Sequence, residues 1–453
     1  MSPLKYILLT IVMAFISSSA VYSQRASLPG QMDKIASTVY KPNVPGAAIV
    51  VVKNGRVIFR KGYGLANLEL HTPVRPEMVF RLASVTKQFT AAAVMMLLER
   101  GKLSLTDDIA KFFPAYKGKK ITVENLLTHT SGIPDYLLKL WPDRMREDMG
   151  PKRLAELFQN EALEFEPGTK ESYSNSNYAL LGLIIENLSG KSYGDFIEQN
   201  IFQPLGMKHS SYETVQQIIP GRVSGYAKTE SGYVNAAYFS MPQLYAAGAL
   251  DSSVDDLALW DASIYSNKLL KQASWDRIFT PYKFKNGENG AYASGWAIGQ
   301  FQGRLIESHE GGVPGFTTYV LRLPQDHVYV AILANDRTME TQPEFVARRL
   351  AAVAIGKPIV DEKIIKLDAA TLTSYAGTYH SDKDGDVNIR TEAGRLFFQS
   401  QNDPEVELFP LAKDKFIIKA FDARVSFVTD GGGNISTLTI QVGDDEGEFK
   451  KVK

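Results

Sequence analysis

Cysteine is absent from this chain of 453 residues. The absence excludes disulfide bonds, thiol nucleophiles and cysteine metal sites, and a chain of this length can bury a large core without disulfides. A net charge of either sign is also missing, because 50 basic and 50 acidic residues cancel. A protein that binds nucleic acid would be expected to carry a basic patch or stripe. The sequence has no Lys/Arg cluster interleaved with aromatics, and it therefore predicts no nucleic-acid partner.

A charge-free apolar run of membrane-spanning length is also missing beyond the N-terminus. The first residues, "MSPLKYILLTIVMAFISSSAVYSQ", have one early cation, Lys5, then an apolar run and then small residues. This layout predicts a secretory signal peptide over residues 1–23, cleaved near Ser23, and hence an exported protein, periplasmic or extracellular. The alternative is a retained anchor, although the apolar core at residues 6–16 is too short to span a bilayer comfortably.

The strand and helix patterns predict an α/β (α+β) fold for residues 24–358. Two β-rich runs meet at Asn54-Gly55, a strong hairpin signal, and two more lie around the turn at residues 324–327. Between them, apolar residues recur at helical spacing, and residues 101–290 are mostly helices and loops. Because strands lie at both ends, we expect one antiparallel sheet flanked by helices, with a mainly helical lobe against it.

The residue pattern of the sequence changes near residue 359. Short alternating runs such as "DVNIR", "RLFFQ" and "KFIIKAF" are separated by turn residues, including "DGGGN". This pattern predicts a small antiparallel β domain over residues 359–453, of meander or barrel type. The segment "DKDGD" at residues 382–386 has some character of a calcium loop, but a hairpin turn is the better interpretation, and no metal site is predicted.

Ser84 and Lys87, in "RLASVTKQF", lie three residues apart at the start of a predicted helix and would share one of its faces. A serine hydroxyl is a weak nucleophile unless a neighbouring group takes its proton, and a lysine one turn later can do so if it is neutral. The S-x-x-K spacing therefore has a mechanism. In isolation, a serine cap followed by a solvated lysine is the commoner structure.

Two further stretches carry polar side chains that could serve a reaction. In "ESYSNSNY", Tyr173 could act on protons and Asn175 could grip a carbonyl, although a turn or capping role is the ordinary alternative. In "SHEGGVPGF", His309 precedes glycines that let a backbone approach a ligand, or it is a satisfied histidine before a loop. His129, in "LLTHTSGIPDY", is interpreted as structural, because Thr, Ser, Gly and Pro around it describe a tight turn.

Taken in order, "SVTK", "YSN" and "HEG" resemble the three motifs of the serine β-lactamase-related superfamily. This superfamily includes class C β-lactamases, penicillin-binding DD-peptidases, D-aminopeptidases and family VIII esterases. Connecting phrases such as "LLTHTSGIPDY", "IFQPLGMKHS" and "AAGALDSSVDDLALW" are also similar, so that the resemblance covers roughly residues 30–356. The C-terminal β domain resembles, more weakly, the lipocalin-like modules appended in this superfamily.

The resemblance implies roles for individual residues. Ser84 would be the acylated nucleophile, Lys87 and Tyr173 would share the proton transfers, and Asn175 would hold a substrate amide or carbonyl. The backbone N–H groups of Ser84 and Gly312 would form the oxyanion hole, and His309, Glu310 and Gly311 would complete the substrate-binding set.

The third motif departs from the Lys-Thr-Gly usual in β-lactamases. Its middle residue, Glu310, is an anion, and the only cation within it would be a partly protonated His309. A substrate carboxylate should be disfavoured there, whereas an ester or a substrate amine would be tolerated.

These observations predict an exported serine hydrolase that forms an acyl-enzyme on an ester, amide or D-amino-acid peptide bond of a small molecule or short peptide. No cofactor is implied. The alternatives are a β-lactamase or DD-carboxypeptidase, a non-catalytic binding or sensor protein of the same fold, and a cell-surface β-domain protein with a hydrolase relic. The sequence leaves the oligomeric state open. The loops at residues 134–160 and 210–247 suggest an aromatic rim to the cleft, or simply core.

Overall fold

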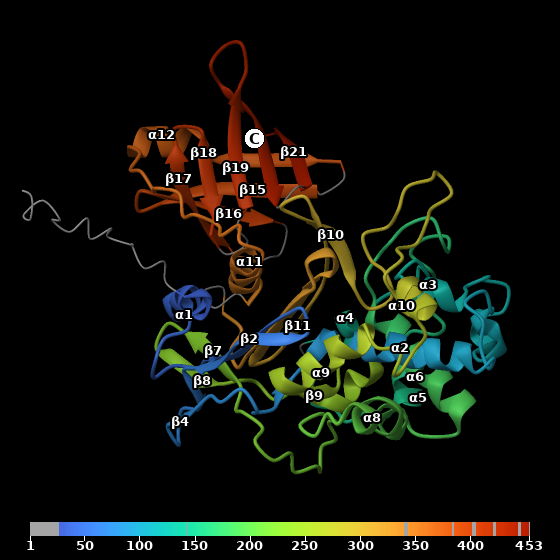
Figure 1. The fold of residues 1–453 in the computed structure, drawn as a ribbon. Coiled ribbons are helices and arrows are strands. Elements are labelled where there is room, and N and C mark those ends of the chain that lie inside the picture. Colours follow the sequence, from blue (N-terminus) through green and yellow to red (C-terminus); the bar gives the residue numbers. More distant parts are fainter. Residues whose placement is uncertain are drawn as a thin grey trace, which may run out of the picture.

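The computed structural model describes residues 27–141, 143–338, 343–382, 385–400, 405–419, 423–442 and 445–452. The predicted signal peptide lies outside these residues, as do Lys383 and Asp384 of the "DKDGD" segment. Figure 1 shows a sheet with helices around it and a separate β-barrel beyond.

The central sheet has the strand order β10-β11-β12-β13-β1-β2, and every neighbouring pair is antiparallel. Its strands are β1 (Ala47–Lys53), β2 (Arg56–Tyr63), β10 (Ala297–Phe301), β11 (Arg304–Val313), β12 (Phe316–Leu323) and β13 (Val328–Ala334). The strands therefore come from both ends of the region, as the sequence predicts. Asn54 and Gly55 both have positive φ, 50° and 71°, which gives β1 and β2 the tight hairpin that this dipeptide favours.

Each face of the sheet is covered by helices, and this covering creates two apolar cores. On one face, α1 (Leu28–Val39) and α11 (Pro343–Ala354) pack against the sheet and against each other. On the other face lie α2 (Thr86–Glu99) and α9 (Val254–Ile264), within a larger core. The strands β1 and β13 are buried almost throughout, which explains why their sequences are continuous runs of apolar residues.

The helical lobe adjoins α2 (Figure 1). Its helices are α3 (Val123–Leu127), α4 (Leu137–Leu140), α5 (Pro151–Glu156), α6 (Asn175–Ser189), α7 (Tyr193–Ile197), α8 (Gln203–Leu205) and α10 (Gln272–Ile278). Its shorter helical turns are η1 (Ala83–Val85), η2 (Ile109–Lys111), η3 (Pro114–Tyr116), η4 (Glu198–Phe202), η5 (Met241–Gln243) and η6 (Tyr245–Ala247), and η7 (Pro324–Asp326) joins β12 to β13.

Three small sheets complete the region. They pair β3 (Leu65–Asn67) with β4 (Thr72–Pro73), β7 (Tyr226–Thr229) with β8 (Gly232–Asn235), and β9 (Leu250–Ser252) with both β5 (Phe80–Arg81) and β6 (Ser211–Tyr212). The last of these sheets matters for the site, because β5 leads directly into η1 and α2.

The C-terminal strands form a closed barrel, one of the two forms that the sequence predicts. The strands are β14 (Gly377–Ser381), β15 (Gly385–Glu392), β16 (Arg395–Ser400), β17 (Val406–Ala412), β18 (Lys415–Ile418), β19 (Ala423–Thr429), β20 (Ile435–Val442) and β21 (Asp445–Lys451), and α12 (Ala369–Ser374) precedes them. Apolar side chains such as Leu396, Phe416 and Phe427 fill a core of their own. The strands β14 and β15 pair with each other from Ser381 and Gly385 onward, on either side of residues 383–384, which lie outside the described residues.

Candidate functional site

Ser84 and Lys87 lie where β5 passes through η1 into α2. Ala83, the residue before Ser84, has a φ of +48°, which is strained for a residue with a side chain. The turn leaves Ser84 partly exposed, while Lys87, one turn later, is fully buried. The predicted juxtaposition is present: Lys87 Nζ lies 3.1 Å from Ser84 Oγ.

Lys87 is held by two further contacts. Its Nζ donates to Asn175 Oδ1 at 2.8 Å and to the backbone carbonyl of Ala247 at 2.9 Å. Burial lowers the pKa of Lys87 to about 7, although the charge of Asp135 works in the opposite direction. A neutral amine has two N–H donors and one lone pair. The two carbonyl oxygens use the donors, so the lone pair is left for the hydroxyl of Ser84.

Tyr173 and Asn175 flank Ser174, the residue that caps α6. Asn175 is the first residue of this helix. Tyr173 is 43% exposed, yet its hydroxyl end is desolvated and hydrogen-bonds the side chain of Ser84. Desolvation raises the pKa of the Tyr173 phenol, the bond to Ser84 opposes this, and the charges of Asp135 and Glu310 raise it further.

His309, Glu310, Gly311 and Gly312 lie in β11, not in a loose loop. Gly311 is in contact with η1: a Cβ at this position would lie 2.3 Å from the Leu82 carbonyl oxygen and 3.2 Å from the Ser84 backbone nitrogen. Because β10 pairs with β11 only as far as Ser308, the segment that follows runs past Ser84 without a β10 neighbour.

His309 differs from the expectation of partial protonation. It is buried, its Nε2 lies 2.8 Å from the Tyr292 hydroxyl, and its Nδ1 lies 2.5 Å from the Glu310 carbonyl oxygen. Because a carbonyl can only accept, Nδ1 carries the proton and Nε2 accepts from Tyr292. Burial lowers the pKa of His309 to about 3, so the ring is neutral and offers no cation to a substrate.

Glu310 is exposed and pairs across the ladder with Tyr319, which belongs to the core on the α11 face. Opposite residues of an antiparallel pair share a face, so the Glu310 side chain leaves β11 on the face opposite to the contact of Gly311 with η1. Its charge still reaches the phenol of Tyr173, whose pKa it raises.

Three residues at the site escaped the sequence analysis or received another role there. Asp135 accepts a hydrogen bond from Asn175 Nδ2 at 2.8 Å, so both ends of the Asn175 amide are engaged. His129 packs on the ring of Tyr173, with the ring centroids 4.4 Å apart. Arg337 is exposed, and its Cζ would lie 3.3 Å from a Cβ on Gly312. Asp135 and His129 both lie in the phrase "LLTHTSGIPDY". Its resemblance to the superfamily is the one feature of the sequence that points to them.

The loops suggested as an aromatic rim divide between surface and core. Leu138, Trp141 and Tyr238 are exposed, whereas Phe239 and Met241 are buried. Trp141 stacks on Phe239 with ring centroids 6.4 Å apart, which joins the two loops.

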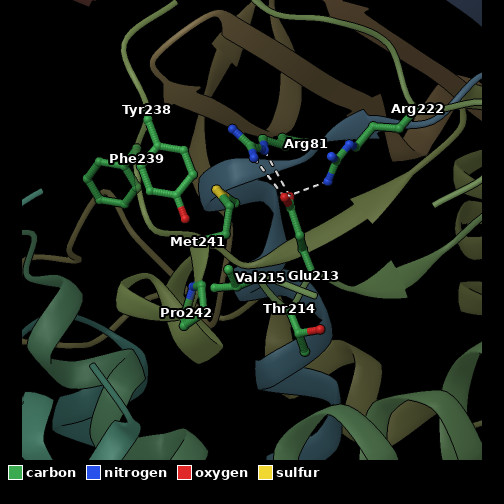
Figure 2. Close-up of a pocket in the computed structure, with 9 residues that line it drawn as sticks. All are labelled: Arg81, Glu213, Thr214, Val215, Arg222, Tyr238, Phe239, Met241 and Pro242. Atoms are coloured by element: carbon green, nitrogen blue, oxygen red, sulfur yellow. Dashed lines mark hydrogen bonds and ion pairs between the residues drawn. The ribbon is translucent and has the colours of Figure 1, made fainter. Parts of the chain in front are cut away.

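A separate pocket, shown in Figure 2, contains none of Ser84, Lys87, Tyr173 and Asn175. Arg81 and Arg222 both bind the buried carboxylate of Glu213 there, with contacts of 2.7 Å. Asp251, on β9, is also buried. Its pKa is raised well above the usual value, mainly by burial and to a lesser extent by the charge of Glu213. This charged cluster ties β5 to the segments on the other side of β9 and so supports the turn before Ser84.

Comparison with known sequences decides the relationship. The sequence model of the family described as Beta-lactamase matches residues 32–355. The chain belongs to this family. Penicillin-binding protein 4* of Bacillus subtilis (strain 168) is 28% identical over 423 residues, which are 88% of this chain and 93% of that protein. This relationship supports a serine hydrolase of the β-lactamase and penicillin-binding protein type.

Solved structures of this type share the fold. The octameric penicillin-binding protein homologue from Pyrococcus abyssi has a TM-score of 0.65 at 27% identity, covering 93% of this chain and 97% of that one. D-amino acid amidase from Ochrobactrum anthropi SV3 has a TM-score of 0.63 at 22% identity, covering 73% of this chain and 97% of that one, and this likeness concerns the fold alone.

Residues 361–451 match a second family, described as a domain of unknown function, DUF3471. This match covers the barrel strands and the segment that leads into them. Within the described part of the chain, no helix combines the length and apolar character needed to cross a membrane.

Proposed function

We propose that this Beta-lactamase family member is an exported serine hydrolase that works through an acyl-enzyme on Ser84. The observation that carries the proposal is the environment of the Lys87 amine, whose burial and three contacts fit a neutral base beside a hydroxyl. A non-catalytic relative that has lost turnover would not need this arrangement.

The reaction begins with transfer of the Ser84 hydroxyl proton to Lys87 Nζ as Oγ attacks the substrate carbonyl carbon. The backbone N–H groups of Ser84 and Gly312 receive the oxyanion. The phenol of Tyr173 gives its proton to the leaving atom, the bond to that atom breaks, and the Lys87 ammonium returns a proton to the phenolate. Water then attacks the acyl-enzyme, with its proton passing to Lys87 and that of Tyr173 passing to Ser84 Oγ as the acyl bond breaks. The Lys87 ammonium then returns a proton to the Tyr173 phenolate, which restores the starting state.

The substrate class follows from the charges around the nucleophile. His309 is neutral, and the carboxylates of Asp135 and Glu310 both act on the Tyr173 phenol. These charges favour an ester, or the amide or peptide of an amino acid with a free ammonium group, such as a D-amino acid amide. The same fold occurs in a D-amino acid amidase.

A second candidate function rests on Arg337. Its guanidinium lies against Gly312, beside the proposed oxyanion amide, and could receive the carboxylate of a leaving group. This contact favours a DD-carboxypeptidase or β-lactamase activity, and in that case Arg337 supplies the cation that His309 lacks.

The test has two stages on the purified full chain. A fluorophosphonate should add its mass to Ser84 in the natural protein and in Ser231→Ala, an exposed-loop control, but not in Ser84→Ala. Labelling of all three proteins alike, or of none, contradicts the proposal. Turnover of p-nitrophenyl esters, D-aminoacyl amides and nitrocefin is then compared. If nitrocefin is cleaved far faster than the others, and Arg337→Gln removes that advantage, the second candidate function replaces the first.

A further inference from the structure

His129 lies directly behind Tyr173 and is almost fully buried. It follows α3 with a φ of +55°, an uncommon conformation for residues other than glycine in which Asn, Asp and His are enriched. Its backbone carbonyl accepts from the Ser172 N–H at 2.9 Å. Its Nδ1 lies 3.2 Å from the Ser174 backbone nitrogen and 3.1 Å from Asn177 Nδ2. The histidine therefore binds the chain on both sides of Tyr173.

The hydrogen bonds fix the tautomer of this ring. A backbone N–H and an amide NH₂ can both only donate, so Nδ1 accepts and the proton is on Nε2. Nε2 is buried and has no hydrogen-bond partner among the described residues. Around the ring lie Tyr173, Tyr292 and Tyr178, with centroid distances of 4.4, 4.5 and 5.2 Å.

A buried N–H without a partner costs free energy, and an apolar side chain of similar size would avoid that cost. Such a side chain, however, cannot accept a hydrogen bond from the backbone N–H of Ser174. His129 therefore lowers the local stability, and at the same time it fixes the backbone between Ser172 and Ser174. Desolvation of the buried ring is the main cause that lowers the pKa of His129 well below its ordinary value, and the neutral ring keeps Nδ1 free to accept.

We infer that His129 is a positioning residue for the Tyr173–Asn175 segment: it holds the phenol against Ser84 and the Asn175 amide against Lys87 through one acceptor nitrogen and one ring face. The inference rests on the proposed function, because it concerns the same acyl transfer. It adds a role for a residue that touches neither the substrate carbonyl nor the reacting oxygen.

Two substitutions separate the acceptor from the ring. His129→Asn keeps a side-chain acceptor and tolerates positive φ, but it removes the ring. His129→Phe keeps a ring between Tyr173 and Tyr292 but offers no acceptor to the Ser174 N–H. His129→Ala removes both. Each protein is titrated for reactive Ser84 with a fluorophosphonate, and kcat and KM for p-nitrophenyl acetate are expressed per titrated site, alongside the thermal midpoint.

We expect His129→Phe and His129→Ala to lower kcat about 100-fold with little change in KM, because a displacement of about 1 Å has this effect on a reacting group. The kcat of His129→Asn should be at least about tenfold higher than that of His129→Ala, as expected if the hydrogen bond from the Ser174 N–H positions Tyr173. A purely structural histidine would change the thermal midpoint and the titrated fraction, but not kcat per site.

Equal kcat per site in all four proteins would overturn the inference, and so would a His129→Asn variant as slow as His129→Ala. If His129→Phe fails to fold, the comparison of Asn with Ala still decides. The proposed function fails separately, if Ser84 of the natural protein takes up no probe.

Discussion

Burial shifts the pKa values of Lys87 and Tyr173, the two groups that face Ser84, in opposite directions. It lowers the pKa of Lys87 to about 7 and raises that of Tyr173 above its ordinary value. Titratable neighbours whose pKa values are pushed apart are a common basis for an acid and base pair. In the proposed reaction the amine is therefore the proton acceptor in acylation, and the phenol, which keeps its proton, is the donor to the leaving group. A resting phenolate is disfavoured, because the charges of Asp135 and Glu310 add to the effect of desolvation.

This assignment predicts how acylation depends on pH. Since Lys87 loses its proton near pH 7, the rate constant for acylation of Ser84 should rise with pH through this region and then level off. Lys87→Arg, whose guanidinium remains protonated, should lower the rate about 10²- to 10⁴-fold throughout. The burst of p-nitrophenol in a stopped-flow experiment, from about pH 5 to about pH 9, measures both.

A profile that falls as the pH passes through 7 would exclude the neutral amine as base. Lys271→Arg, at an exposed lysine before α10, is the control and should reproduce the natural profile.

At the scale of elements, the site depends on how closely β11 approaches η1. Thr318, opposite Gly311 in the ladder, donates its hydroxyl to the Leu82 carbonyl at 3.0 Å. A Cβ on Gly311 would lie 2.3 Å from that same carbonyl oxygen, which is backbone and cannot move aside without moving η1. For a Cβ on Gly312, the three nearest atoms would belong to the end of the Arg337 side chain, at 3.3–3.5 Å.

Two adjacent glycines of one strand should therefore respond differently to the same added methyl group. Gly311→Ala should separate β11 from η1 and lower kcat about 100-fold, because the oxyanion amides and Ser84 lose their alignment. Gly312→Ala keeps its N–H and should cost only a few-fold. Steady-state kinetics with p-nitrophenyl acetate and thermal denaturation of both variants provide the measurement. Equal losses in the two would show that the approach of β11 to η1 does not limit the reaction.

The sequence predicts the elements well where the signal is local. The Asn54-Gly55 turn, the helix that follows Ser84 and the alternating strands of the barrel all depend on neighbouring residues, so that periodicity and turn chemistry suffice. The closure of the barrel follows from no single run, since it depends on β14 pairing with β21.

The candidate site is less accessible to sequence reasoning, because its electrostatics arise between distant segments. The neutral state of His309 depends on burial beside Tyr292, and the commitment of the Asn175 amide depends on Asp135. Arg337 follows β13, which β12 separates from β11 in the sheet, and its side chain nevertheless lies against Gly312. None of these contacts has a spacing that could be read along the chain. Asp135 lies in a phrase that resembles the superfamily, whereas Tyr292 and Arg337 lie in none of those phrases.

At the scale of the molecule, the barrel and the region around the central sheet have separate apolar cores. The segment between them is attached to both sides: Asp361 bonds Arg349 of α11 at 2.7 Å, and Glu362 bonds Arg424 of β19 at 2.6 Å. Asp361 and Glu362 are exposed, so that solvent screens both pairs, although Arg349 itself is buried; an exposed ion pair contributes only up to about 1 kcal/mol. These links are weak compared with either core.

We therefore expect the predicted division at residues 358 and 359 to mark two units that fold independently. A chain of residues 24–358 should fold, and its Ser84 should react with a fluorophosphonate at a rate within about threefold of the full chain. The reason is that, among the described residues, the hydrogen-bond partners of Ser84, Lys87 and Tyr173 all lie outside the barrel. Calorimetry of the full chain should give two transitions, one of which the shorter chain retains. If the shorter chain folds but its Ser84 reacts far more slowly, the barrel contributes to the site; if it does not fold, the two cores form one cooperative unit.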